Sequence, residues 1–181
     1  MRPSKRSSGS DLSDTSIGKW VFANHTDDFA NKSDQRLTLR AEQATRTQAG
    51  DSIYAELWIS CGSQFRAIGN RAMVVVAGIP VSYNHPDLYD LTQIQYRFES
   101  DTKPRSHFEQ FSDVEHRIFY LGDFFGPAFS KGMFQDMLNA KELRIRYDPL
   151  LGDVTETLTF EVAGLRAAIQ KLDKCDWPDA R

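Results

Sequence analysis

Apolar and polar residues alternate along most of this chain, and the alternation predicts a series of β-strands. From Gln35 to Gln43, for example, apolar residues alternate with polar ones, which is typical of a strand with one buried face. Residues 72–81 instead form a run rich in β-branched residues, as expected of a central strand. The predicted strands are residues 18–24, 35–43, 53–61, 72–81, 94–98, 107–111, 116–121, 143–147 and 158–162.

Two other segments repeat their apolar residues at helical spacing. Phe129, Met133 and Met137 lie four residues apart, and we expect their helix to open at Gly126-Pro127, because proline is tolerated in a first helical turn. Residues 164–175 have apolar positions spaced for an amphipathic helix that packs on the sheet. The chain is therefore predicted to have one helix between strands and one C-terminal helix.

The order of these elements predicts the fold class. Parallel neighbours need crossover helices, and helices appear here in only two places, so we expect mainly antiparallel pairing. The predicted fold is mainly β, either a β-sandwich or a curved antiparallel sheet, with the C-terminal helix packed on it. Residues 17–178 are predicted to form a single domain, and residues 1–16, rich in Ser, Asp and Gly, a flexible tail.

Composition narrows the function classes. The 181 residues are 40% apolar and 26% charged, which is typical of a globular domain. A net charge of −3 argues against a general nucleic-acid binder, because such proteins need an excess of Lys and Arg to neutralise phosphates. The apolar runs are too short for a transmembrane helix.

The two cysteines leave two interpretations open. Cys61 lies on the apolar face of a predicted strand, and Cys175 lies at the end of the last predicted helix. A disulfide between them would join the C-terminal segment to the sheet. Alternatively, both are separate buried thiols, as expected in a reducing compartment.

No catalytic motif is present, and we expect neither a cofactor nor a metal. The histidines lack the spacing of common zinc sites. His25 with Asp27 and Asp28 is the one short polar group that could serve a weakly marked metal-dependent hydrolase. An Asp-Asp pair after a strand is more often part of a turn.

Several residues are candidates for binding a partner. Arg97, Arg144 and Arg146 lie opposite the apolar faces of their strands, and Trp58 and Tyr54 do likewise on theirs. If these strands are neighbours, they form an aromatic and basic face that suits an acidic partner or a sugar. The alternative is a solvated sheet face with pairs to Glu56, Glu99 or Glu156. Further candidates, Tyr83 and Tyr89, lie in the predicted loop 82–90.

The ordered pattern of these segments resembles the VasI-like family of small proteins associated with type VI secretion. The resemblance extends over roughly residues 18–177. The matching segments are Trp20-Val21 with Asp27-Asp28, 37–41 (LTLRA), 57–61 (LWISC), 96–98 (YRF), 119–123 (FYLGD), 143–149 (LRIRYDP), 159–165 (TFEVAGL), and Cys175 with Trp177.

The resemblance implies a non-enzymatic accessory protein of the bacterial envelope. Its partner would be another protein or a cell-wall component, and its cysteines Cys61 and Cys175 would be bridged. Proteins of this family are normally exported, so we expect a periplasmic location if Met1 is not the natural start. If the chain is complete as printed, we expect a cytoplasmic partner-binding module, as in a phage or mobile element, with free thiols.

Overall fold

The computed structural model describes residues 16–27, 32–47, 49–62, 71–82, 91–110, 115–121, 131–151 and 154–177. Most of the predicted tail therefore lies outside the described residues. Ser16, which the sequence assigns to that tail, pairs with Val21 in a short hairpin. Gly18 lies in the loop of this hairpin with a φ of 62°, a value that glycine adopts without strain.

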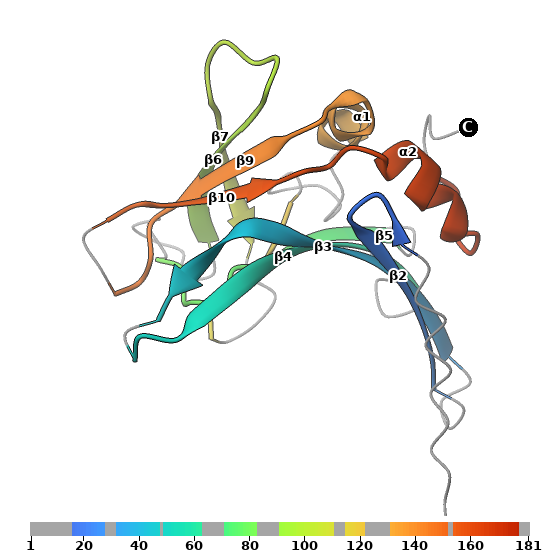
Figure 1. Ribbon diagram of the computed structural model, residues 1–181, viewed down its shortest axis with the longest axis horizontal. Coiled ribbons are helices and arrows are strands. Elements are labelled where there is room, and N and C mark those ends of the chain that lie inside the picture. Colours follow the sequence, from blue (N-terminus) through green and yellow to red (C-terminus); the bar gives the residue numbers. More distant parts are fainter. Residues whose placement is uncertain are drawn as a thin grey trace, which may run out of the picture.

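Two antiparallel sheets make up the fold (Figure 1). The six-stranded large sheet has the order β1-β2-β3-β4-β5-β8, and the four-stranded small sheet has the order β10-β9-β6-β7. The strands of the large sheet are β1 (Ser16–Ile17), β2 (Trp20–Asp27), β3 (Lys32–Arg46), β4 (Ser52–Cys61), β5 (Arg71–Val76) and β8 (Ile118–Tyr120). Those of the small sheet are β6 (Leu91–Phe98), β7 (Arg105–Gln110), β9 (Leu143–Tyr147) and β10 (Glu156–Phe160).

The small sheet packs over the curved large sheet (Figure 1). The apolar residues that alternate along the strands form one buried cluster, in which Leu57 and Ile59 of β4 and Ile145 of β9 are fully buried. Both the mainly β class and the antiparallel pairing predicted from the sequence are confirmed. Among the described residues, no helix is long and apolar enough to cross a bilayer.

Of the two predicted helices, the C-terminal one differs from the prediction. The helix α1 (Lys131–Asn139) buries Met133 and Met137 as expected, while its predicted opening at residues 126–127 lies outside the described residues. The predicted helix 164–175 is wrong in its extent. In its place the structure has a shorter helix, α2 (Leu165–Ala168), followed by a 3₁₀ turn, η2 (Ile169–Lys171). The chain leaves helical geometry at Leu172, where φ is −87° and ψ is 68°, and turns toward β4.

Four strands also differ from their predictions. β3 runs on to Arg46 because a register shift between Arg40 and Ala44 absorbs extra residues against β4. β5 ends at Val76, and Val81 forms an isolated bridge with Pro149 instead. β7 and β8 were predicted as successive strands, but β7 pairs with β6 in the small sheet and β8 with β5 in the large one.

Candidate functional site

Three arginines meet on the outer surface of the small sheet. Arg97 of β6 pairs directly with Arg144 of β9, and Gln95 pairs with Arg146. Thr157 of β10 pairs with Arg146 from the other side. All five side chains are exposed. We call these five residues the arginine face. Like charges directly opposite on neighbouring strands destabilise a sheet, so the pairing of Arg97 with Arg144 is not explained by stability.

Two of the three carboxylates that the sequence offers as partners, Glu99 and Glu56, are engaged elsewhere. Glu99 accepts hydrogen bonds from the backbone amides of Lys141 (2.8 Å) and Glu142 (3.0 Å). Glu56 accepts a hydrogen bond from the Trp58 indole at 2.7 Å. Loss of some water contact at Glu99 opposes its ionisation, but hydrogen bonds from backbone amides, including these two, and the charge of Lys141 together outweigh that effect and lower the pKa of Glu99.

Only one arginine of the face forms an ion pair among the described residues. Arg144 pairs through Nε with Glu142, which directly precedes β9, at 2.6 Å. Arg97 and Arg146 form no ion pair within the part of the chain that the structure describes. The face therefore carries two guanidinium groups whose charge is not compensated there. Each can donate paired hydrogen bonds to a carboxylate.

The surface is hollowed at the arginines. One hollow of about 250 Å³ is lined by all five residues of the arginine face, together with Tyr96 and Pro104. A second, of about 260 Å³, shares Gln95 and Arg146 with the first and continues to Asp148 and Thr155. Because the two hollows share Gln95 and Arg146, they lie side by side, and we call them together the groove. Adjoining open hollows suit an extended segment of a partner better than a small molecule held on all sides.

The predicted combined face of arginines and aromatic residues is wrong. Trp58 and Tyr54 belong to β4 of the large sheet, while the arginines lie on the small sheet. On the large sheet, Arg36 lies 4.1 Å from the centre of the Trp58 ring, and Arg40 lies 3.8 Å from that of Tyr54. Trp58 is thus occupied within its own sheet and adds nothing to the arginine face.

The other predicted candidates lie partly or wholly outside the described residues. Tyr83 and Tyr89 are both outside them. His25 and Asp27 lie at the end of β2, where His25 pairs in register with Asp34 of β3, and Asp28 is outside the described residues. Within those residues, no group of three His, Cys, Asp or Glu side chains is arranged to hold a metal.

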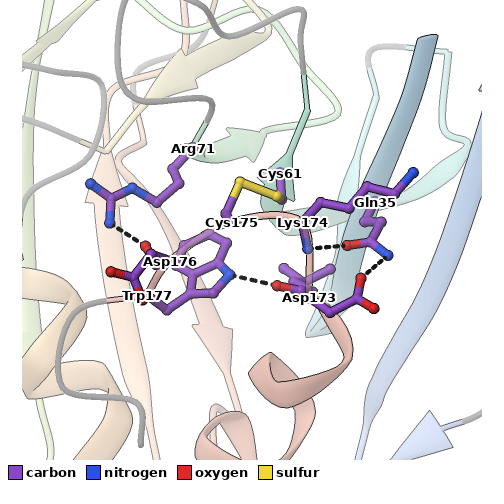
Figure 2. Close-up of a disulfide and its surroundings, with 9 residues drawn as sticks. Gln35, Cys61, Arg71, Asp173, Lys174, Cys175, Asp176 and Trp177 are labelled. Atoms are coloured by element: carbon purple, nitrogen blue, oxygen red, sulfur yellow. Dashed lines mark hydrogen bonds between the residues drawn. A yellow bond between two sulfur atoms is a disulfide. The ribbon is translucent and has the colours of Figure 1, made fainter. Parts of the chain in front are cut away.

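The two cysteines form a disulfide. Cys61 ends β4 and is fully buried, and Cys175 follows η2 at a Cα–Cα distance of 5.8 Å. They are separated by 114 positions in the sequence. The first of the two interpretations of the cysteines is therefore the one observed. Figure 2 shows the bond and the residues around it.

Gln35 holds the segment that carries Cys175 (Figure 2), and it is not among the candidate residues predicted from the sequence. Its Nε2 donates a hydrogen bond to Oδ1 of Asp173 at 2.8 Å, and its Oε1 accepts one from the backbone amide of Lys174 at 3.2 Å. Gln35 is only 5% exposed and pairs in register with Cys61. A signal was present, because Gln35 is a polar residue in phase with the buried Leu37 and Leu39.

Beyond the disulfide, the C-terminal segment packs back on the protein. The centre of the Trp177 ring lies 5.4 Å from the centre of the Phe134 ring in α1. The Trp177 indole donates a hydrogen bond to the carbonyl of Leu172 at 3.1 Å. Arg71 of β5 donates one to the carbonyl of Asp176 at 2.6 Å (Figure 2). Residues 172–177 are thus fixed to both sheet and helix.

Arg105 links the β6–β7 hairpin to α1. Its guanidinium contacts Asp136 at 2.6 Å and Asp101 at 2.8 Å. These two carboxylates raise the pKa of Arg105 further above its ordinary value. Asp101 also accepts a hydrogen bond from the amide of Phe98 at 2.9 Å. The hairpin beside the arginine face is therefore held in place by charge-assisted bonds.

Comparison with known proteins identifies a shared fold. No model of a protein family matches the chain, and no curated protein matches it. Among solved structures, it is similar to the crystal structure of invasion associated protein B from Bartonella henselae, with a TM-score of 0.52 and 9% sequence identity. The match covers 88% of this chain and 94% of the other. At this identity, the comparison shows that the two proteins share an arrangement of strands.

Proposed function

We propose that this chain is a non-enzymatic accessory protein of the bacterial envelope that binds an acidic partner protein through the arginine face. The observation that carries the proposal is the pair Arg97 and Arg146, exposed beside Arg144 without an acidic partner among the described residues. The fold gains nothing from placing these like charges together. Their arrangement is accounted for if a partner supplies the counter-charges.

Two further observations support an envelope protein. The Cys61–Cys175 disulfide suits an oxidising compartment such as the periplasm. The sequence resemblance to the VasI-like family supports the same location, and the assignment to type VI secretion rests on that resemblance. The structural neighbour is itself a bacterial protein described as invasion associated, and the proposal takes from it only a shared scaffold.

Binding of a polyglutamate peptide by calorimetry tests the arginine face. The double variant Arg97→Gln with Arg146→Gln should bind the peptide at least about tenfold more weakly, because each loses a charge-assisted hydrogen bond to a carboxylate. Binding by the wild type should also weaken as salt is raised. The urea unfolding midpoint of the variant should stay close to that of the wild type, since both side chains are exposed.

Arg40→Gln provides the matched control. Arg40 is also an exposed strand arginine, but it stacks on Tyr54 on the large sheet. The Arg40→Gln variant should bind the peptide with the same affinity as the wild type. If Arg40→Gln lost as much affinity as the double variant, or if the double variant lost none, the arginine face would not be the binding surface.

A further inference from the structure

The turn between β9 and β10 presents a group of exposed apolar side chains. Leu150 is 39% exposed, Leu151 65% and Val154 74%. We call these three residues the hairpin tip. They make up half of the large apolar side chains that are exposed among the described residues, the others being Val21, Tyr54 and Phe108. A concentration of this kind marks an interaction site more often than isolated exposed residues do.

The base of the hairpin tip is fixed to the rest of the molecule. The amide of Leu150 donates a hydrogen bond to the carbonyl of Pro80 at 2.9 Å, and the amide of Ser82 donates one to the carbonyl of Asp148 at 2.7 Å. The hydroxyl of Thr155 donates to Oδ1 of Asp148 at 2.9 Å. A base that is already ordered loses less conformational entropy when a partner covers the tip.

The hairpin tip lies close to the end of the groove that contains the arginine face. The groove that starts at the arginines ends at Asp148 and Thr155, which flank the tip in the chain. Leu150 follows Arg146 by four residues, or at most about 13 Å at roughly 3.3 Å per residue of extended chain. An extended partner segment of a few residues can therefore reach from one to the other.

We propose that the hairpin tip and the arginine face form one docking surface for an extended acidic segment of a partner protein, which places carboxylates on Arg97 and Arg146 and apolar side chains on Leu151 and Val154. This inference rests on the proposed function and specifies the chemistry of the partner. A protein is a better occupant than an anionic lipid surface, because Asp148 lies at the end of the groove nearest the hairpin tip and the chain has a net charge of −3.

Two short synthetic peptides test this arrangement. Both carry glutamates at one end, and the other end carries either leucines or serines. Wild-type protein should bind the leucine peptide about tenfold or more tightly than the serine peptide, because burial of apolar side chains adds to the contact with the arginines. The variant Leu151→Ser with Val154→Thr should lose this difference while keeping the wild-type affinity for the serine peptide.

Two other variants distinguish a failure of the proposed function from a failure of the role proposed for the hairpin tip. Val21→Thr changes an exposed apolar residue on the large sheet and should keep the tenfold preference. Arg97→Gln with Arg146→Gln should weaken both peptides equally. If that variant bound both peptides as the wild type does, the proposed function would fail. If it weakened both but the wild type showed no preference for leucine, only the role of the hairpin tip would fail.

Phosphatidylglycerol vesicles address the competing occupant. The proposal expects no difference in vesicle binding between the wild type and the variant Leu151→Ser with Val154→Thr. Vesicle binding by the wild type that this variant loses would overturn the assignment to a protein partner and place the tip at a lipid surface.

Discussion

Gln35 shows how one polar side chain inside the sandwich can position a distant segment. It faces the interior from β3 and takes part in hydrogen bonds with Asp173 and Lys174, which lie near the other end of the chain. Burying an amide is unfavourable unless its hydrogen bonds are made, and here both its donor and its acceptor are used. The segment that carries Cys175 is therefore held by a second attachment besides the disulfide.

Replacing Gln35 with an apolar residue of similar volume should destabilise the protein, because the hydrogen bonds of its amide group are lost. Gln35→Leu removes two hydrogen bonds and leaves the Asp173 carboxylate and the Lys174 amide without their partner, so we expect a loss of about 1–3 kcal/mol in the free energy of unfolding. Urea denaturation measures the change. Gln43→Leu, an exposed position on the same strand, is the control and should stay within about 0.5 kcal/mol of the wild type.

The β6–β7 hairpin depends on ionised groups for its position against α1. Arg105 holds Asp101 within the hairpin and Asp136 in the helix. Partial burial of Asp101 opposes its ionisation, but the hydrogen bonds from the Phe98 amide and from Arg105 outweigh it and lower the pKa of Asp101. The hairpin is thus stabilised by the charged form of this carboxylate.

Asp101 should therefore make the stability depend on pH in acid. Because its pKa is lower in the folded state, its contribution is complete above about pH 4, the ordinary value for Asp, and is lost as the pH falls through the folded-state value. Asp101→Asn should lower Tm at neutral pH, and the difference from wild type should shrink below about pH 4. Thermal unfolding followed from acid to neutral pH measures this. The same Tm difference at every pH would contradict it.

Single elements could be predicted well where a pattern is local. The alternation over residues 143–147 predicts a strand, and β9 has these same bounds. The end of the last helix was predicted too late. Apolar spacing continues past Lys171, but the attachments at Gln35, Cys61 and Arg71 take residues 172–177 out of helical geometry.

The disulfide joins the end of the chain to a central strand of the large sheet. It closes a loop across a separation of 114 residues, which restricts the unfolded chain strongly. Cys61→Ala with Cys175→Ala should therefore lower the free energy of unfolding by about 2–5 kcal/mol, as measured by urea denaturation.

Reduction of the wild type provides the matched comparison. Wild-type protein in excess reductant should unfold near the midpoint of the double alanine variant, since both lack the bond. If both kept the midpoint of the oxidised protein, the disulfide would contribute nothing to stability. In that case the hydrogen bonds of Gln35 and Arg71 would be sufficient to hold the C-terminal segment.

The arrangement of the sheets determines which candidate residues can act together. Alternation correctly placed Arg97, Arg144 and Arg146 on outward positions of their strands, and β6 and β9 are indeed neighbours. The same alternation placed Trp58 outward, but on a strand of the other sheet. Side-chain periodicity depends only on the local backbone, whereas strand neighbours depend on how the whole chain closes its core.

The amino-acid sequence was sufficient to predict the mainly β class, most strand positions and the inward faces, because these follow from short-range patterns of apolar residues. It did not reveal that the chain changes sheets between β7 and β8, that Gln35 would meet Asp173, or that the groove beside the arginines would extend to Asp148 and Thr155. These features arise from contacts between residues far apart in the chain. They form only when both sheets bury their apolar faces against each other.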